Sequence, residues 1–184
     1  HDLEAHDIAA MYRLFEGYYD GACAAQFERD LSSKTHIIEL RNGDELCGFS
    51  TLAVFDLDDT EPLRVIFSGD TIIQRAYWGE QALAWAFCRF AGATKRHTAG
   101  RRLYWLLISK GHRTYRYLHL FARSYHPHPS TSAPAEVALR MHRIARERFG
   151  SNYDEAAGIV RFGTAGTRLQ SQWHDLRAGH RQLP

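Results

Sequence analysis

Cysteine is scarce in this sequence of 184 residues, which holds only Cys23, Cys47 and Cys88. Their odd number and scattered positions, without a CxxC pair, exclude a disulfide framework and a cysteine zinc site. They are typical of reduced thiols in a cytoplasmic protein. No apolar run approaches the roughly 18 residues of a transmembrane helix, so we expect no membrane partner. The acidic, polar start from His1 to Glu4 does not predict a signal peptide either.

Several catalytic signatures are missing as well. The sequence has no GxSxG nucleophile elbow, no Walker A loop and no HExxH motif. Its 11 histidines do not fall in a metal-ligand pattern. The segment His126-Pro127-His128-Pro129 has no cysteine or carboxylate nearby and is more typical of a rigid linker than of a metal site. We therefore expect no metal.

Acidic residues are absent from one long stretch. Gln81 to Ala135 holds nine basic residues and no acidic one, whereas His1 to Glu80 holds 16 acidic and 6 basic residues. Two interpretations are open: a solvated basic face balanced by the acidic first half, or a site for an anion such as a nucleotide, a phosphorylated cofactor or nucleic acid. The sequence pI near 8.5 lies below the strongly basic range of nucleic-acid domains, which argues against nucleic acid as a partner.

The hydrophobic pattern predicts one domain with helices and strands in a definite order. Helical spacing covers 8–19 and 23–31, and strand-like runs at 35–40 and 46–55 flank a hairpin signal at Arg41 to Asp44. A third strand is expected at 63–73, with Gly69 inside it indicating a bulge. The remaining expected elements are a helix at 81–91 that ends at Gly92, a strand at 103–108, helices at 112–124 and 132–149, and a short strand at 157–162.

Three sequential strands followed by alternating helices and strands predict an α/β (α+β) fold. We expect a mixed, mostly antiparallel sheet with helices on both faces, in which strands 63–73 and 103–108 run parallel and diverge. Residues 1–129 would form the core, and 130–184 would add a C-terminal helix and strand to the same domain, with an incomplete C-terminal end left open. The sequence leaves a homodimer open.

The segment from Ile72 to Leu83, IIQRAYWGEQAL, joins a strand to a helix through a loop that contains Gly79. With the element order from Ile8 to Tyr125, it resembles the GNAT superfamily of acyl-CoA-dependent N-acyltransferases. The resemblance implies that acetyl-CoA or another acyl-CoA lies where the fourth strand diverges from the fifth. Its diphosphate would meet the loop glycine and the positive end of the helix dipole. The cofactor contacts expected in this motif are Ile73, Trp78, Gly79, Gln81 and Ala82.

The motif departs from the family pattern at two places. With Gly79 as the first glycine, Ala76 stands where the family has Gln or Arg, and Gln81 stands where it has Gly or Ala. The amides of Gly79, Gln81 and Ala82 remain able to hold a phosphate. Trp78 is expected either against the cofactor or as a packing residue. The altered loop also leaves open a different donor, such as an acyl-carrier protein or a long acyl chain.

The resemblance places the chemistry at the end of strand 63–73. A bulge there would turn backbone N–H groups near Gly69 and Thr71 toward the thioester carbonyl, as an oxyanion hole does. Asp70 would accept a proton from the attacking amine, directly or through water. The family often places a tyrosine acid in the helix at 112–124, so Tyr115 and Tyr117 are candidates, with packing as their other interpretation.

A basic cluster surrounds the turn after strand 103–108. Lys110, Arg113 and Arg116 stand at and just after this turn, and the two arginines are three residues apart on one helical face. They could hold the adenosine phosphate or an acidic group of the substrate through charge-assisted hydrogen bonds. Their other interpretation is a solvated basic face.

Two classes of function follow from these observations. The first is an acyltransferase in which a small-molecule amine attacks the thioester of an acyl-CoA directly. The second is a non-catalytic module that binds a polyanion or nucleic acid through the basic stretch, whose aromatic residues interleave the cations. Against the second, strand 103–108 has the apolar character of a buried core, so its aromatic residues would not be free to stack on bases.

Overall fold

The computed structural model describes residues 3–58, 61–98, 100–108, 112–128, 130–162 and 166–173, with only the backbone at 112 and 113. The chain forms two compact units. The first comprises the described parts of His1–Lys110 together with Thr167–Trp173, and the second comprises the described parts of Gly111–Gly166. This division falls near residue 110, and the sequence-based boundary between 129 and 130 stays a prediction.

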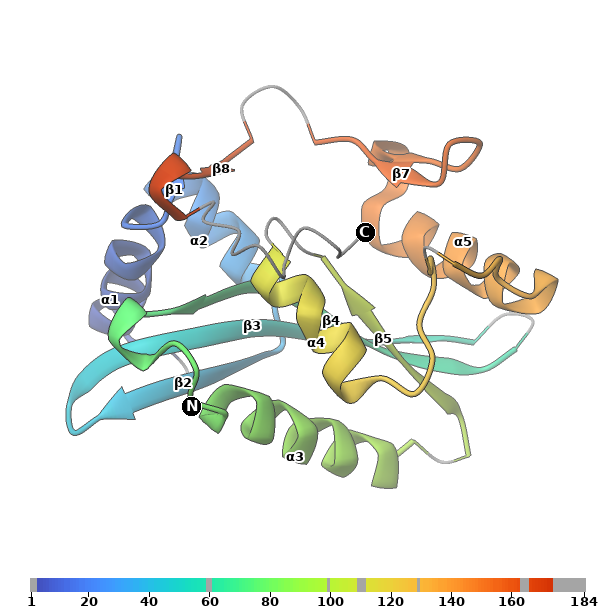
Figure 1. Ribbon diagram of the computed structural model, residues 1–184, viewed down its shortest axis with the longest axis horizontal. Helices are drawn as coiled ribbons and strands as arrows, with labels where there is room; N and C mark the ends of the chain where they lie inside the picture. The colour runs from blue at the N-terminus through green and yellow to red at the C-terminus, as the bar shows by residue number, and fades with distance from the viewer. Residues whose placement is uncertain are drawn as a thin grey trace. The chain divides into compact units, whose positions relative to one another are not determined.

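The first unit is built on a four-stranded sheet in the order β2-β3-β4-β5. Its strands are β2 (His36–Asn42), β3 (Glu45–Leu57), β4 (Leu63–Ile73) and β5 (Arg102–Leu107). The β2–β3 and β3–β4 pairs are antiparallel, and the β4–β5 pair is parallel. The sheet is therefore mixed and mostly antiparallel, as the sequence predicts (Figure 1).

Two helices cover one face of this sheet. They are α1 (Ala5–Glu16) and α2 (Ala24–Ser32), and between them lies the short strand β1 (Tyr19–Asp20), which pairs with β8 (Arg168–Leu169). The helices bury apolar side chains at helical spacing against the sheet, because those positions share one helix face. The core that results is Met11, Phe15, Phe27, Leu31, Leu46, Phe49 and Ile72.

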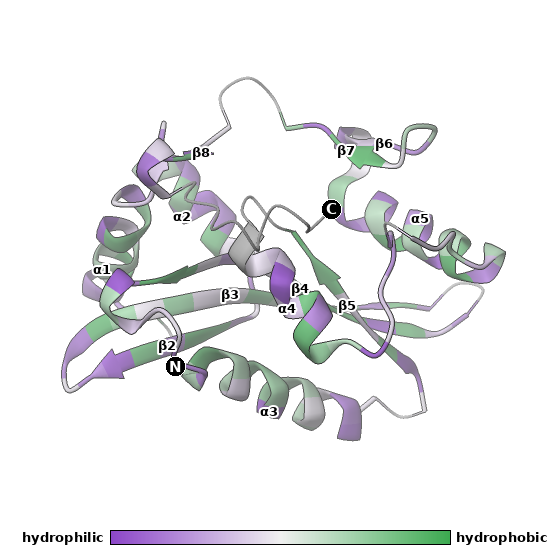
Figure 2. Ribbon diagram, viewed as in Figure 1, coloured by the Kyte–Doolittle hydropathy of each residue, from purple (hydrophilic) through white to green (hydrophobic). Residues whose placement is uncertain are grey.

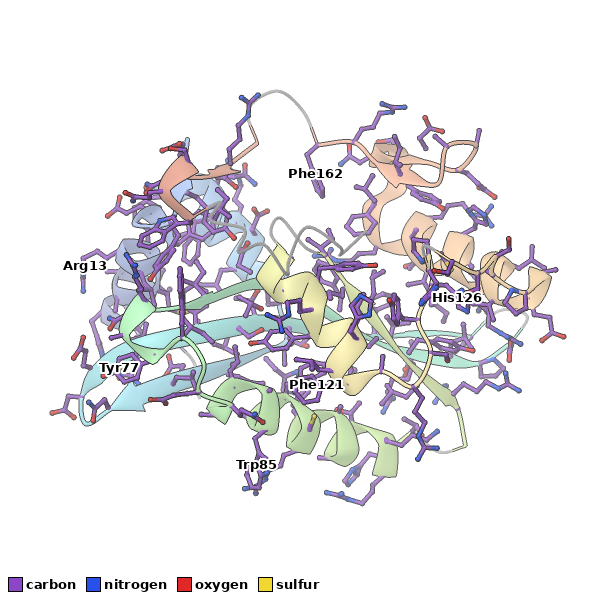
Figure 3. All side chains as sticks on the ribbon, viewed as in Figure 1. Arg13, Tyr77, Trp85, Phe121, His126 and Phe162 are labelled. Atoms are coloured by element: carbon purple, nitrogen blue, oxygen red, sulfur yellow. The ribbon has the colours of Figure 1, made fainter. Side chains whose placement is uncertain are left out.

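The helix α3 (Ala82–Arg96) covers the other face. Its Leu83 is buried, and its Phe87 ring lies 4.6 Å from the ring of Trp105 on β5. The outward side of α3 carries Trp85, which is 63% exposed and lies 4.9 Å from the guanidinium of Arg89 (Figure 3). Gly92 does not end this helix, contrary to the sequence-based expectation. An isolated glycine costs a helix interior about 1 kcal/mol, which packing of the helix against the sheet offsets.

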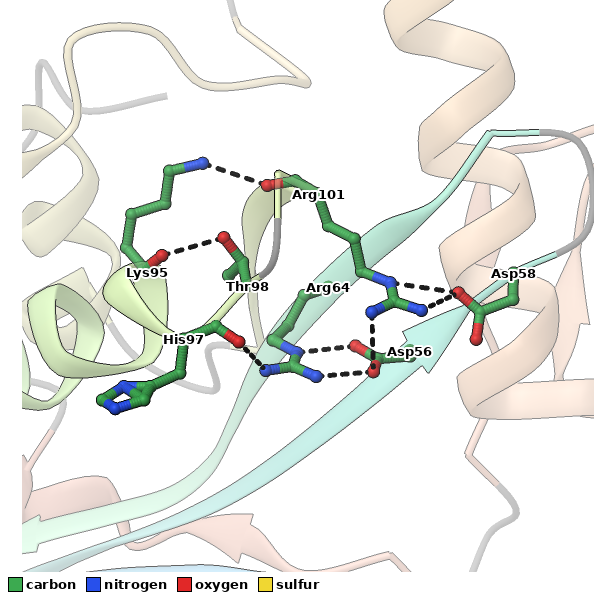
Figure 4. Close-up of polar contacts among 7 residues, drawn as sticks. All are labelled: Asp56, Asp58, Arg64, Lys95, His97, Thr98 and Arg101. Atoms are coloured by element: carbon green, nitrogen blue, oxygen red, sulfur yellow. Dashed lines mark hydrogen bonds and ion pairs between the residues drawn. The ribbon is translucent and has the colours of Figure 1, made fainter.

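The end of α3 is tied to the hairpin of β3 and β4 by ion pairs (Figure 4). Arg64 on β4 donates two hydrogen bonds of 2.7 Å to the carboxylate of Asp56 and one of 3.0 Å to the carbonyl of His97. Arg101, just before β5, pairs with Asp58 at 2.6 Å. The Arg64 guanidinium lowers the pKa of Asp56. This network holds the α3–β5 connection against the sheet and thereby fixes where β5 begins.

The second unit contains α4 (His112–Phe121) and α5 (Ala135–Phe149), followed by the antiparallel pair of β6 (Tyr153–Asp154) and β7 (Ile159–Val160). His142 on α5 bonds to the Tyr153 hydroxyl at 2.6 Å, which joins the helix to this pair. The described part of the chain also includes three short 3-10 turns, η1 (Arg75–Tyr77), η2 (Gly150–Asn152) and η3 (Ser171–Trp173). Figure 2 shows the hydropathy of these elements, with the C-terminal end of α3 strongly hydrophilic.

Candidate functional site

The parallel pairing of β4 with β5 stops before β4 ends. The last pair joins Ser68 to Leu107, and among the described residues β4 continues from Gly69 to Ile73 paired with β3 alone. The hydrogen-bonded pairing of the two parallel strands therefore ends in the middle of β4. This is the place where the sequence predicts the opening for an acyl donor.

Some backbone groups of this stretch of β4 face away from β3. Gln74 donates its N–H to the carbonyl of Cys47 at 2.8 Å, which makes these two a hydrogen-bonded pair of the β3–β4 ladder. Such pairs alternate along an antiparallel ladder, so the backbone groups of Ile73 and Thr71 face away from β3. Trp78 confirms this for Ile73, because its indole N–H donates to the Ile73 carbonyl at 2.8 Å from that side. The Thr71 and Ile73 peptide groups thus face the side where β5 is missing.

A bulge interrupts β4 at the start of the opening. The register pairs Ser50 with Thr71 and Leu52 with Ser68, so Gly69 and Asp70 together oppose the single residue Thr51. This confirms the bulge that the strand glycine predicts. A bulge of this kind shifts the side-chain alternation by one residue.

The bulge directs Asp70 toward the α1–α2 face of the sheet. Tyr19 lies on that face, where its ring stacks on Phe15 at 4.8 Å. Burial raises the pKa of Tyr19 to about 12, and the negative charge of Asp70 adds to the rise. Tyr19 therefore stays protonated across the physiological range, and Asp70 is the group of this pair that can accept a proton.

Lys34 and Thr51 lie against the bulge on the same face. A Cβ at Gly69 would come within 2.8 Å of both Lys34 Cε and Thr51 Oγ1, so only glycine leaves room for this contact. Thr51 is 1% exposed, and its hydroxyl has no hydrogen-bond partner among the described residues. On the opposite face, the Ser50 and Thr71 hydroxyls share a hydrogen bond of 2.8 Å.

The loop after β4 presents a helix N-terminus. Gly79 has φ +103°, a conformation that L side chains rarely adopt, so the loop needs glycine there. Gln81 is the N-cap of α3, makes no side-chain capping bond, and is followed by a first turn without acidic residues. The predicted phosphate contacts Gly79, Gln81 and Ala82 are all exposed. This end of α3 can attract an anion through its dipole and amides.

An aromatic cluster of Tyr18, Trp78 and Trp173 packs at this loop. Trp78 lies 5.4 Å from Trp173 and 6.4 Å from Tyr18, and Tyr18 lies 4.8 Å from Trp173. The guanidinium of Arg75 sits 5.9 Å from the Trp173 ring centroid. The Tyr18 hydroxyl accepts a hydrogen bond from the backbone of Arg75, which counteracts the rise in Tyr18 pKa that burial causes. Trp78 thus packs within the protein, and its contact with a cofactor stays a prediction.

The remaining predicted residues belong to the second unit or lie outside the described residues. Tyr115 lies 5.5 Å from His119 and contacts Tyr125 through their rings at 6.3 Å. Tyr117 is partly buried, and this burial raises the pKa of its hydroxyl. Arg116 is exposed on α4. Lys110 and the Arg113 side chain lie outside the described residues, so a basic cluster at this turn stays a prediction, as do the roles of both tyrosines.

Sequence reasoning missed Tyr19, Lys34 and Trp173. Tyr19 is the last residue of an apolar helical pattern, and such a position predicts only a packing role. Lys34 stands in a short polar connector, where a lysine is ordinarily solvated. Trp173 follows a segment with few apolar residues. For Lys34 a signal did exist, because a glycine inside a strand indicates the close approach of another group.

Among the described residues, no three His, Cys, Asp or Glu side chains gather closely enough to hold a metal ion. No helix in the described part of the chain combines the length and the apolar character needed to cross a membrane.

The fold resembles solved structures over most of their length. Ribosomal-protein-alanine N-acetyltransferase from Brucella melitensis biovar Abortus 2308 matches 72% of this chain and 96% of its own, with a TM-score of 0.54 and 12% identity. A predicted acetyltransferase with acetyl-CoA from Clostridium acetobutylicum matches 71% and 92%, with a TM-score of 0.50 and 11% identity. A transcriptional regulator from Bacillus halodurans C-125 matches 73% and 97%, with a TM-score of 0.50 and 12% identity.

No protein-family model and no curated protein sequence matches the chain. The similarity is thus one of fold, and it agrees with the mixed, mostly antiparallel sheet described above. The chain has the fold of the GNAT N-acetyltransferases and is a divergent example of it.

Proposed function

We propose that the chain is an acyl-CoA-dependent N-acyltransferase in which an amine attacks the donor thioester directly. One observation carries the proposal: β4 continues past its last pair with β5, with a bulge at Gly69–Asp70 and the peptide groups of Thr71 and Ile73 facing the open side. The amides of the CoA arm can pair with the Thr71 groups and the Ile73 N–H as a strand would, since the Ile73 carbonyl already accepts from Trp78. The N-terminus of α3, which follows β4 through the Gly79 loop, would receive the diphosphate.

In this proposal the bulge polarises the thioester carbonyl and Asp70 handles the proton. An attacking amine is an ammonium at neutral pH and must lose a proton to become a nucleophile. Asp70, directly or through a water, accepts that proton on the α1–α2 face. Tyr19 contributes a phenol that stays protonated beside Asp70. Tyr115 or Tyr117 would donate a proton to the leaving thiolate.

The acceptor is proposed to be a small-molecule amine, approaching from the α1–α2 face where Asp70 lies. The donor is proposed to be acetyl-CoA or a longer acyl-CoA, with a carrier-protein donor as the variant that the altered loop favours. Gln81 stands where the family pattern has a small residue, which is the feature that favours this variant. A cytoplasmic location also belongs to the proposal.

The experiment measures thiol release from acetyl-CoA and longer acyl-CoAs with a panel of amines. Asp70→Asn is compared with Asp44→Asn, which removes the same charge from an exposed hairpin residue. We expect Asp70→Asn to lower turnover about a hundredfold or more with folding intact, and Asp44→Asn to leave it unchanged. If Asp70→Asn keeps full turnover and loses only stability, Asp70 is structural and the proposed base is wrong.

A further inference from the structure

The Lys34 side chain lies against β4 at the bulge. The residue follows α2, is partly buried, and donates from Nζ to the Asp30 carbonyl at 2.8 Å and to the Ser33 hydroxyl at 3.4 Å. Nζ also lies 5.9 Å from the centroid of the Phe67 ring on β4. These contacts direct the side chain back across α2 and onto the strand, instead of outward into solvent.

The bulge glycine brings this ammonium close to the β4 backbone. Nζ lies 3.5 Å from the position that a Cβ at Gly69 would occupy, and Cε lies 2.8 Å from it. Phe67 and Gly69 both lie against Lys34, and the charge of the neighbouring Asp70 acts on Tyr19. An amine, a strand bulge and a carboxylate thus lie together on one side of the sheet.

We propose that Lys34 is a self-acylation site: without another amine, the bound acyl-CoA transfers its acyl group to Lys34 Nζ. The inference rests on the proposed function, because the donor thioester must lie at the bulge. The Lys34 ammonium gives a proton to Asp70, and its nitrogen forms a C–N bond to the thioester carbonyl carbon. The nitrogen loses its second proton as the C–S bond breaks, and the CoA thiolate that leaves takes up one proton. The products are acyl-Lys34 and CoA, with one net proton released.

The scarcity of lysine makes this site unusually easy to test. Lys34, Lys95 and Lys110 are the only lysines in the chain, against 20 arginines. Lys95 lies near the C-terminal end of α3 and donates to the Arg101 carbonyl at 3.0 Å. It is therefore a matched internal control, an amine of the same type that contacts the α3–β5 connection and not the bulge.

The experiment incubates the full chain with acetyl-CoA and no added amine, and maps acetylation on its peptides by mass spectrometry. We expect Lys34 to be modified at least tenfold faster than Lys95, with a first-order rate that does not depend on protein concentration at saturating acetyl-CoA. Lys34→Arg should abolish this fast phase while Lys95→Arg keeps it. Asp70→Asn should slow the phase, and denatured chain should show the slow background rate at all lysines.

A parallel melting measurement with CoA tests the proposed donor site separately from the acylation of Lys34. If CoA raises the melting temperature and Lys34 reacts no faster than Lys95, self-acylation is overturned and the donor site stands. A fast Lys34 phase that survives Asp70→Asn contradicts the proton transfer to Asp70. If CoA does not bind and acetyl-CoA does not modify Lys34, the proposed function fails together with the inference.

Discussion

Substituting alanine at two glycines should change stability in opposite directions. At Gly69 a new Cβ would stand 2.8 Å from Lys34 Cε and 2.8 Å from Thr51 Oγ1. The end of the lysine can move away, but Thr51 is buried inside the sheet and cannot. At Gly92, in the interior of α3, the nearest atom to a new Cβ is the Arg96 Nη1 at 4.0 Å. The second site has open space and a helical backbone.

The expected magnitudes follow from these surroundings. Overpacking in a close-packed interior costs about 1–3 kcal/mol, so Gly69→Ala should lower the free energy of unfolding by that amount. Gly92→Ala removes a flexible residue from a helix and should raise it by about 0.5–1 kcal/mol. With a urea m-value of roughly 2 kcal/mol/M, the two denaturation midpoints should differ by about 0.7–2 M.

Urea denaturation followed by far-UV circular dichroism measures both variants under one condition. Equal midpoints, or a Gly69→Ala variant as stable as the parent, would show that the bulge has room for a side chain. The close packing of Thr51 against the bulge would then be wrong. A Gly92→Ala variant that is less stable would contradict the helix through residue 92.

Further substitutions test other parts of the structure. Asp56→Asn should cost about 0.5–1 kcal/mol at neutral pH, a surface value that allows for screening by solvent. Because the folded pKa of Asp56 is lowered, its stabilisation is present above the unfolded value near 4 and disappears as pH falls through the folded value, which urea titrations at several pH values check. Met11→Ala, at a fully buried position, should cost about 2–5 kcal/mol in the same assay. Gly79→Ala should strain a backbone at φ +103° by about 1–3 kcal/mol and weaken CoA binding in calorimetry.

The sequence predicts the elements of the first unit because apolar residues recur with different spacings in its helices and in its strands. The alternating pattern of β2 and β3, the hairpin signal between them and the glycine within β4 correspond to the observed strands and bulge. The sequence wrongly predicts the end of α3 at Gly92 instead of Arg96, because a local helix breaker carries no information on the packing of the helix on the sheet. The glycine of the bulge is the most informative residue, since it indicates both the irregular strand and the close contact.

The partners of Asp70 were beyond sequence reasoning. Tyr19 and Lys34 are 51 and 36 residues away from Asp70 in the chain, and only the sheet and its covering helices bring them to one face. The support of the Gly79 loop by Trp173 depends on the pairing of β8 with β1. Short polar strands of two residues carry almost no periodic signal, so this contact has no trace in the sequence pattern.

The most direct test of the account is the thermal unfolding of the intact chain with CoA, acetyl-CoA and longer acyl-CoAs, beside oligonucleotides of matched charge. The account predicts that an acyl-CoA at about 100 times its dissociation constant adds roughly 2.7 kcal/mol to the free energy of unfolding. The melting temperature should rise accordingly, and oligonucleotides should leave it unchanged. If every CoA species at millimolar concentration leaves the melting temperature unchanged, the opening beside β4 is not a donor site and the central claim is contradicted.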